Sequence, residues 1–271
     1  MKDAFAKTIR LGLIGKDVSK SLSEEMHAFI LSAWNIACEY QRFSTAKDGF
    51  DDAMRTLLGD FDGFNVTIPY KKDVFEYLDD IALDASACSS VNTVVTATRK
   101  GYNTDGAGFL WMLQSAGIAV QDKKVLVIGA GGSGRSSALA LKNAGANVYM
   151  YRRNQAELIE ICERLGVTPV STAESGEYDI LINCTGVGMH DTEGKSPVSK
   201  DAFRNATWAV DLIYVPKESE FLRLAKTQGL QILNGASMLF YQAYLADCLY
   251  VERQPDMDEA KRLYEAYLKR K

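Results

Sequence analysis

A glycine-rich segment, Gly129-Ala130-Gly131-Gly132-Ser133-Gly134, has the residue types and spacing of a phosphate-binding loop. The apolar run before it, Lys124–Ile128, predicts a buried parallel strand. The residues after it, Arg135–Asn143, predict a helix that ends with a left-handed cap at Gly145. Glycine lets the backbone approach a ligand closely, and the first N–H groups of a helix attract a pyrophosphate. We therefore expect a dinucleotide site here, the alternative being an ordinary glycine-rich turn.

Basic residues follow the next predicted strand, Asn147–Tyr151. In dinucleotide-binding folds a carboxylate about 20 residues after the first glycine holds the ribose 2′-hydroxyl of NAD. Arg152, Arg153 and Asn154 stand there instead. Guanidinium groups suit a 2′-phosphate, which a carboxylate would repel, so the sequence favours NADP over NAD. The alternative is a basic loop that contacts only solvent.

Lys71 and Asp105 are the side chains best suited to proton transfer. The segment 61–72 predicts a strand that runs into a helix begun by Pro69, with Lys71 in the first helical turn. Helix N-termini favour anions, so a lysine against this preference hints at function. Asp105 could pair with Lys71 and fix its charge. The alternatives are a surface lysine and a turn or helix-capping aspartate.

Two serines, Ser21 and Ser23, stand at the start of a helix predicted to end near Ala33. Hydroxyls at a helix N-terminus can hold an anionic substrate group such as a carboxylate. They can equally well do no more than cap the helix. The sequence leaves both interpretations open.

Amides and a further hydroxyl are predicted in two other elements. Asn65 and Thr67 are two residues apart on a predicted strand, so they point to the same side. Gln242 stands within the apolar helix predicted over 236–249, where a buried amide needs a hydrogen-bond partner. A substrate hydroxyl or a backbone group would satisfy it.

The elements that position these residues alternate between strands and helices, which indicates an α/β fold. In the first part of the chain we expect strands over 8–14, 38–44 and 91–96 and helices over 49–58 and 109–116. After the strands at 124–128 and 147–151, a third is expected over 179–184, then strands over 208–213 and 231–233 around a helix over 218–228. An amphipathic helix over 256–271 closes the prediction.

Length and composition are those of a two-domain globular protein: 271 residues, 47% apolar and 24% charged, with a net charge of −4. The mild acidity argues against nucleic-acid binding. No apolar run is as long as a membrane span, and Met1–Ala4 does not begin a secretory signal. Five scattered cysteines and two histidines fit a reduced cytoplasmic protein without a metal centre.

Several segments together resemble the shikimate dehydrogenase family, in order and spacing along nearly the whole chain. They are Ser-Leu-Ser at 21–23 with His27, Asn-Val-Thr-Ile-Pro-Tyr-Lys at 65–71, Val-Asn-Thr at 91–93, Gly-Tyr-Asn-Thr-Asp-Gly at 101–106, the glycine loop, Asn-Cys-Thr-Gly-Val-Gly-Met at 183–189, Asp-Leu-Ile-Tyr-Val-Pro at 211–216, and Gly-Ala-Ser-Met-Leu at 235–239 with Gln242. The resemblance implies an α/β protein with a Rossmann NADP-binding domain, a split α/β substrate-binding domain and a cleft between them. The implied boundaries are 106–236 for the Rossmann domain and 1–105 with 237–271 for the substrate domain.

The resemblance also implies roles for individual residues. The substrate carboxylate would be held by Ser21 and Ser23, and Lys71 would be the acid/base, oriented by Asp105. The ring hydroxyls would be read by Asn65, Thr67, Asn92, Asp105 and Gln242, with Tyr214 lining the site. Pyrophosphate would be bound by Gly129, Ala130, Gly131, Gly132 and Ser133, and the 2′-phosphate by Arg152, Arg153 and Asn154. The cofactor site would be completed by Leu212, with Gly235 and Met238 beside the nicotinamide.

The implied activity is reversible reduction of 3-dehydroshikimate to shikimate with NADPH, a step toward chorismate and the aromatic amino acids. The expected partner is a small-molecule substrate, with neither nucleic acid nor membrane, and the expected assembly is a monomer or homodimer.

The chain departs from the family pattern at a few positions. Lys20, Glu24 and Ala28 stand where the family often has histidine, proline and asparagine. The usual Asn-Arg-Thr after the second Rossmann strand is replaced by 152–154, which makes NAD an alternative cofactor. The alternative functions are a quinate- or amino-shikimate-preferring dehydrogenase that uses NAD, and a non-catalytic NADP-binding regulator.

Overall fold

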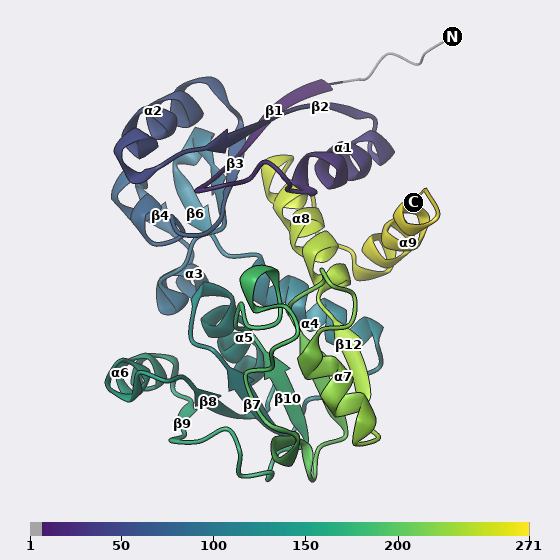
Figure 1. The fold of residues 1–271 in the computed structure, drawn as a ribbon. Coiled ribbons are helices and arrows are strands. Elements are labelled where there is room, and N and C mark those ends of the chain that lie inside the picture. Colours follow the sequence, from purple (N-terminus) through teal and green to yellow (C-terminus); the bar gives the residue numbers. More distant parts are fainter. Residues whose placement is uncertain (1–6, 271) are drawn as a thin grey trace. The chain divides into compact units, whose positions relative to one another are not determined.

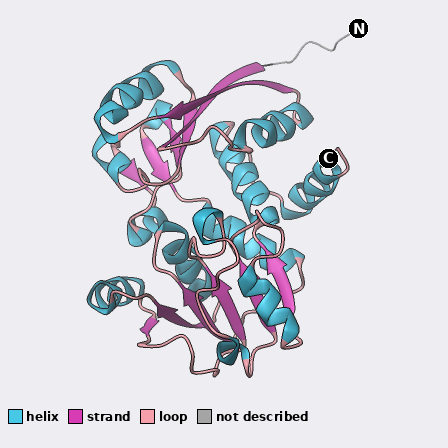
Figure 2. Cartoon of the chain, in the orientation of Figure 1, coloured by secondary structure: helices cyan, strands magenta, loops and turns pink. Residues whose placement is uncertain are grey.

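In the computed structural model of the protein, which describes residues 7–270, the helices and strands form two units (Figures 1 and 2). Unit 1 contains the described residues up to Thr104 and those from Phe240 onward. Unit 2 contains Asp105–Leu239. Over the described residues each unit is built on one six-stranded sheet.

The sheet of unit 1 is mixed. Its strand order is β2-β1-β3-β5-β6-β4, with β1 parallel to β2 and β3, and β5 antiparallel to β3 and β6. The strands are β1 (Lys7–Gly15), β2 (Ile36–Ser44), β3 (Gly63–Val66), β4 (Asp80–Ile81), β5 (Thr93–Val95) and β6 (Lys100–Tyr102). Because side chains alternate along a strand, each strand sends residues to both faces of this sheet.

Helices cover both faces of that sheet. The helices of unit 1 are α1 (Ser23–Ala33), α2 (Phe50–Asp60), α3 (Leu83–Cys88), α9 (Met257–Leu268), and α8 (Ala236–Tyr250), whose first turn belongs to unit 2. Phe64 packs with Leu57 of α2 in one apolar cluster, whereas Ile9 packs with Leu31 of α1 and Ala246 of α8 in another. A Cβ added at Gly63 would meet the ring of Tyr250 in α8. Since Asn65 shares the strand face of Gly63, it points to the α1 and α8 side.

The sheet of unit 2 is parallel throughout and has the strand order β12-β11-β10-β7-β8-β9. Its strands are β7 (Lys124–Ile128), β8 (Asn147–Tyr151), β9 (Thr168–Pro169), β10 (Ile180–Asn183), β11 (Trp208–Asp211) and β12 (Gln231–Asn234). Its helices are α4 (Asp105–Ser115), α5 (Gly132–Asn143), α6 (Gln155–Leu165) and α7 (Glu220–Thr227). This is the Rossmann order, and the direction of winding reverses between β7 and β10, where such sheets bind ligands.

The predicted helix after Pro69 is wrong. In the structure β3 leads into a turn, followed by the short 3₁₀ segment η2 (Asp73–Tyr77). The Lys71 carbonyl accepts a hydrogen bond from the Val91 N–H at 2.8 Å. Because that bond leads out of the segment, the carbonyl is drawn away from the bond to residue 75 that an α-helix requires. Lys71 therefore lies in a turn and not in the first turn of a helix.

Three smaller predictions also need correction. The strand at 179–184 is the fourth of the Rossmann sheet and not the third, because the two-residue strand β9 was too short to show a pattern. The helix predicted over 109–116 begins four residues earlier, at Asp105. The closing helix spans Met257–Leu268, with Asp256 as its N-cap. Lys271, like Met1–Ala4, lies outside the described residues.

Candidate functional site

The two serines at the start of α1 are hydrogen-bonded to each other. The Ser21 hydroxyl donates to the Ser23 hydroxyl at 3.0 Å and accepts the Ser23 N–H at 3.2 Å. The N-cap position itself is held by Leu22, whose side chain makes no capping bond. The serines therefore help to order the first turn and also present hydroxyls at a helix end that favours an anion.

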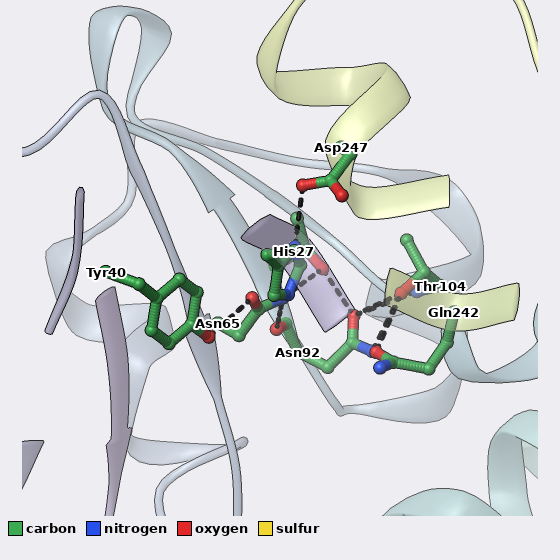
Figure 3. Close-up of polar contacts among 8 residues, drawn as sticks. His27, Tyr40, Asn65, Asn92, Thr104, Gln242 and Asp247 are labelled. Carbon is green, nitrogen blue, oxygen red and sulfur yellow. Dashed lines mark hydrogen bonds and ion pairs between the residues drawn. The ribbon is translucent and has the colours of Figure 1, made fainter. Parts of the chain in front are cut away.

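Tyr40, on β2, continues this hydrogen-bonded series. Its hydroxyl donates to Asn65 Oδ1 at 3.3 Å (Figure 3). The same hydroxyl is also hydrogen-bonded to the Ser23 hydroxyl. Because the tyrosine gives its hydrogen to Asn65, Ser23 is the donor to Tyr40. Burial raises the pKa of Tyr40 well above its usual value, so this hydroxyl keeps its proton. The Tyr40 hydroxyl thus connects Ser23 at the start of α1 to Asn65 on β3.

Hydrogen bonds of the Asn65 and Asn92 amides extend this network to Gln242 on α8. Asn65 Nδ2 donates to the Asn92 carbonyl at 3.2 Å and to Thr93 Oγ1 at 3.3 Å, and Thr93 donates to Asn92 Oδ1 at 2.9 Å. Asn92 Nδ2 then donates to Thr104 Oγ1 at 2.9 Å and to Gln242 Oε1 at 3.3 Å (Figure 3). Gln242 thus has side-chain partners. A continuous network connects five of the residues expected to bind substrate, namely Ser21, Ser23, Asn65, Asn92 and Gln242.

Three members of this network were not predicted: Tyr40, Thr93 and Thr104. Thr93 and Thr104 stand next to Asn92 and Asp105 in the quoted segments, so hydroxyls beside predicted contacts were a usable signal. Tyr40 carried no such signal, because its partners are distant in the sequence.

Thr67 and Lys71 follow β3. Thr67 is half-buried, and its N–H donates to the Ile14 carbonyl at 2.9 Å. Lys71 is also half-buried, and its carbonyl bond to Val91 holds this turn beside the segment that contains Asn92. The backbone around the expected acid/base is therefore tied directly to the hydrogen-bonded network.

Asp105 and Tyr214 belong to unit 2, whereas Lys71 belongs to unit 1. Asp105 is buried, begins α4 and directly follows Thr104 in the chain. Tyr214 is half-buried in the loop after β11. The pairing of Asp105 with Lys71 stays a prediction.

The glycine loop between β7 and α5 has the geometry of a dinucleotide site. A Cβ added at Gly134 would come 2.1 Å from the Gly129 carbonyl oxygen, so this glycine permits close packing of helix and loop. A Cβ added at Gly131 would meet nothing within 4 Å. Gly131 is exposed and is the N-cap of α5, where unpaired N–H groups follow. The loop thus leaves open space at the helix end that favours a phosphate.

Ala130, Gly132 and Ser133 complete this loop. The Arg135 guanidinium donates to the Ala130 carbonyl at 3.2 Å, and the Ser136 hydroxyl donates to the Gly132 carbonyl at 3.0 Å. Ser133 is half-buried in the first turn of α5. These bonds hold the loop by its carbonyls, and the Gly129 N–H donates to the Tyr151 carbonyl at 2.8 Å. An anion would meet the N–H groups at the start of α5.

The basic residues after β8 differ in their surroundings. Arg152 pairs with Glu157 at 2.5 Å, whereas Arg153 is exposed. Asn154 is the N-cap of α6 and accepts the Glu157 N–H at 3.4 Å. Arg153 is therefore the guanidinium in this loop best placed to meet a phosphate from solvent.

Leu212 and Gly235 lie against each other. A Cβ at Gly235 would come 2.2 Å from the Leu212 carbonyl oxygen, so only glycine fits here. Met238 is buried in the first turn of α8. These residues follow the ends of β11 and β12, at the edge of the sheet where the glycine loop also lies.

A buried carboxylate fixes the loops after β10 and β11. Asp211 Oδ1 accepts from Asn183 Nδ2 at 3.1 Å and from the Ile213 N–H at 2.9 Å, and Oδ2 accepts from the Ser219 hydroxyl at 2.5 Å. Burial raises the pKa of Asp211 to about 6, although these hydrogen bonds favour the charged form. Asn183 Oδ1 in turn accepts the Thr185 hydroxyl at 2.6 Å. One side chain thus anchors both loops.

Within residues 7–270 no helix is long and apolar enough to cross a membrane. Within the same range, no group of three or more histidine, cysteine, aspartate or glutamate side chains is arranged to hold a metal ion.

Comparison with known proteins finds relatives that cover 94% of the chain. Residues 13–94 match the family model of the shikimate dehydrogenase substrate-binding domain, and residues 119–185 match that of the acetohydroxy acid isomeroreductase NADPH-binding domain. The chain is 35% identical to the shikimate dehydrogenase (NADP(+)) of Thermus thermophilus, over 94% of this chain and 98% of that protein.

Solved structures show the same likeness. Shikimate 5-dehydrogenase from Thermus thermophilus, in complex with NADP(H) and shikimate, superposes with a TM-score of 0.87 at 32% identity, covering 95% of this chain and 99% of that one. Quinate dehydrogenase from Corynebacterium glutamicum, in complex with NAD, superposes with a TM-score of 0.80 at 28% identity, covering 96% and 99%.

Proposed function

The chain belongs to the shikimate dehydrogenase family, and from that premise we propose which of its residues bind the substrate, bind the cofactor and transfer the proton. It is an NADP-dependent oxidoreductase that interconverts 3-dehydroshikimate and shikimate. The observation that supports the substrate roles is the network from Ser21 to Gln242, which places hydroxyls and amides of α1, β3 and α8 in one connected set. A polyhydroxylated acid needs such a set of donors and acceptors.

In the proposed site the substrate carboxylate lies at the start of α1, beside Ser21 and Ser23, where the helix end favours negative charge. The ring hydroxyls are read by Asn65, Thr67, Asn92 and Gln242, which can both donate and accept, and by Asp105, whose carboxylate accepts. Tyr214 is a further proposed residue of the substrate site. A substrate that lacks one of the ring hydroxyls would lose the corresponding hydrogen bond, which gives the site its selectivity.

Lys71 is the proposed acid/base. NADPH, when bound, supplies the hydride to the substrate carbonyl carbon. The ammonium form of Lys71 donates a proton to the carbonyl oxygen as that oxygen becomes a hydroxyl. Asp105 orients the lysine and accepts a hydrogen bond from a substrate hydroxyl. In the reverse direction neutral Lys71 takes the hydroxyl proton.

The cofactor residues follow from the loop geometry. Gly129, Ala130, Gly131, Gly132 and Ser133 surround the pyrophosphate at the start of α5. Arg153 meets the 2′-phosphate, with Arg152 and Asn154 ordering its loop through Glu157. Leu212, Gly235 and Met238 border the nicotinamide. The exposed arginine supports NADP as the preferred cofactor over NAD.

The assay that tests this follows reduced nicotinamide by absorbance, with shikimate and quinate each offered with NADP and with NAD. We expect the highest kcat/KM for shikimate with NADP. Higher kcat/KM for quinate with NAD would favour the alternative suggested by the likeness to the quinate enzyme. Tight NADP binding without any turnover would favour a regulator.

Three further features belong to the proposal. We place the Rossmann domain at 106–236 and the substrate domain at 1–105 with 237–271. We propose a monomer or a homodimer, which gel filtration with light scattering would distinguish. A cytoplasmic location is supported by the free state of Cys38, Cys88, Cys162, Cys184 and Cys248.

A further inference from the structure

A histidine and an aspartate form a buried pair behind the network of polar side chains. His27 Nδ1, on α1, lies 2.6 Å from Asp247 Oδ1, on α8, and both side chains are fully buried (Figure 3). The remaining polar atom of each, His27 Nε2 and Asp247 Oδ2, has no hydrogen-bond partner among the described residues. Burial raises the pKa of Asp247 to about 6, and His27 opposes that rise.

Such a pair is weak evidence of stabilisation. Removing two polar groups from water costs free energy that one hydrogen bond does not fully offset, and here two atoms stay unpaired. Apolar side chains of similar size would fill the same space without that cost. We therefore expect the pair to orient neighbouring side chains rather than to stabilise the fold.

Tyr40 connects the His27–Asp247 pair to the proposed substrate contacts Ser23 and Asn65. The imidazole of His27 stacks on the Tyr40 ring, with centroids 5.1 Å apart and planes 16° apart. Tyr40 in turn is hydrogen-bonded to Ser23 on α1 and to Asn65 on β3. Asp247 fixes the orientation of the imidazole, and the imidazole face limits where the phenol can lie. The pair also links α1, which carries Ser23, to α8, which carries Gln242.

We propose that Tyr40, held in place by the His27–Asp247 pair, is a positioning residue that orients Ser23 and Asn65 for the substrate. This inference rests on the proposed function, because it takes Ser23 and Asn65 as substrate contacts. Tyr40 acts by presetting two side chains from different elements, which lowers the entropy lost when substrate binds. Its loss should therefore weaken substrate binding and leave NADP binding unchanged.

The first test replaces Tyr40 with phenylalanine, which keeps the stacked ring and removes the hydroxyl. We expect the Tyr40→Phe enzyme to show a KM for shikimate about 5- to 20-fold higher, the effect of losing two hydrogen bonds, with KM for NADP unchanged. Tyr244→Phe is the matched control, because it removes a buried tyrosine hydroxyl on α8 that donates to Glu259 at 2.6 Å. The control should leave both KM values unchanged.

The second test asks whether the pair acts through Tyr40. Asp247→Asn keeps an oxygen for the His27 N–H and should retain a KM near that of the wild type, whereas Asp247→Leu removes it and should raise KM for shikimate. His27→Asn puts a donor where Nδ1 lies but removes the ring. The double variant His27→Asn with Tyr40→Phe should raise KM no more than the larger single effect, because both changes interrupt one path.

The results separate this inference from the proposed function. If the wild-type enzyme does not reduce NADP with shikimate, the proposed function fails and this inference fails with it. If the wild type is active and Tyr40→Phe has the KM of the wild type, only the inference fails. Strictly multiplicative effects of His27→Asn and Tyr40→Phe on KM would also overturn it, and would show that the pair acts independently of the phenol. Thermal unfolding of each variant identifies any that fail to fold.

Discussion

At the scale of single residues, a backbone hydrogen bond holds the turn that carries Lys71. The carbonyl of Lys71 is bonded to the Val91 N–H, one residue before the buried amide of Asn92. The lysine is therefore fixed at its backbone while a long side chain extends from a half-buried position. A substitution at its side chain should leave this anchor intact, which makes the residue suitable for a kinetic test.

Lys71→Ala is expected to lower kcat by about 10²–10⁴, the usual contribution of general acid–base catalysis. KM for shikimate should change little, because the lost interaction acts mainly in the transition state. Steady-state kinetics on enzyme that still binds NADP would measure this. Lys72→Ala is the control, since the neighbouring lysine is exposed. A Lys71→Ala enzyme that keeps more than about a tenth of wild-type kcat would show that the proton comes from another group.

Arg153→Ala is expected to raise KM for NADP about 10- to 100-fold, because a charged hydrogen bond to phosphate contributes about 1.5–3 kcal/mol. KM for NAD, which has no 2′-phosphate, should stay the same. Arg164→Ala is the matched control, because Arg164 is exposed in the last turn of α6, the helix that begins just after Arg153. Equal rises for NADP and NAD would assign Arg153 to loop structure instead of phosphate recognition.

At the scale of elements, alanine substitutions at two glycines of one loop should have different effects, one on stability and the other on NADP binding. A methyl group at Gly134 would come within 2.1 Å of the Gly129 carbonyl, so Gly134→Ala forces α5 away from the loop and lowers the melting temperature. Gly131 has open space around its Cβ position and a φ of −70°, so Gly131→Ala should fold with nearly unchanged stability. Its methyl group would project toward the proposed pyrophosphate and raise Kd for NADP. Thermal unfolding and NADP titration of the two variants should therefore give opposite patterns.

Local patterns were sufficient where an element's structure follows from its own residues. The strands β7 and β8 were predicted with their observed bounds, because each is a short apolar run bounded by glycine or polar residues. The helix expected after Pro69 failed because the Lys71 carbonyl is bonded to Val91, twenty positions later in the chain. Proline signals a helix start only when the following carbonyls are free to bond within the helix.

The candidate site shows the same division. Polar side chains within recognisable segments, such as Asn65 and Asn92, could be proposed from sequence. Tyr40 could not, since its partners Ser23, His27 and Asn65 come from two other elements. The role of Asp247 could not be predicted from sequence either, because it stands in an apolar helix 220 residues from its partner His27. Connections made only by tertiary packing leave no periodic pattern in the chain.

At the scale of the whole molecule, each unit contains a buried carboxyl group whose pKa is raised to about 6: Asp247 in unit 1 and Asp211 in unit 2. In both cases burial is the largest cause, because it disfavours the charged form. Each group therefore opposes the folded state when it is ionised. The hydrogen bonds that Asp211 accepts keep this cost limited, and they fix two loops next to the proposed nicotinamide position.

The pH dependence of stability follows from the sign of that shift. Between about pH 4 and pH 6 the native state holds a proton on Asp211 that the unfolded state has released. Stability from this group is therefore fully present below about pH 4 and is lost as the pH rises through about 6. Exposed carboxyl groups with lowered pKa, such as Asp80, contribute with the opposite sign. The change of the wild-type unfolding free energy with pH is therefore the sum of all these contributions.

Asp211→Asn isolates the contribution of this one group. The amide keeps an oxygen for the Ile213 N–H and cannot ionise, so the variant lacks the loss of stability between pH 4 and 6. Relative to the wild type, it should gain up to about 3 kcal/mol of unfolding free energy between pH 4 and pH 7, the equivalent of the shift in pKa. Urea unfolding of both proteins across this range measures the difference. A difference that does not vary with pH would mean that Asp211 is already ionised in the native state at pH 4, and that its hydrogen bonds outweigh its burial.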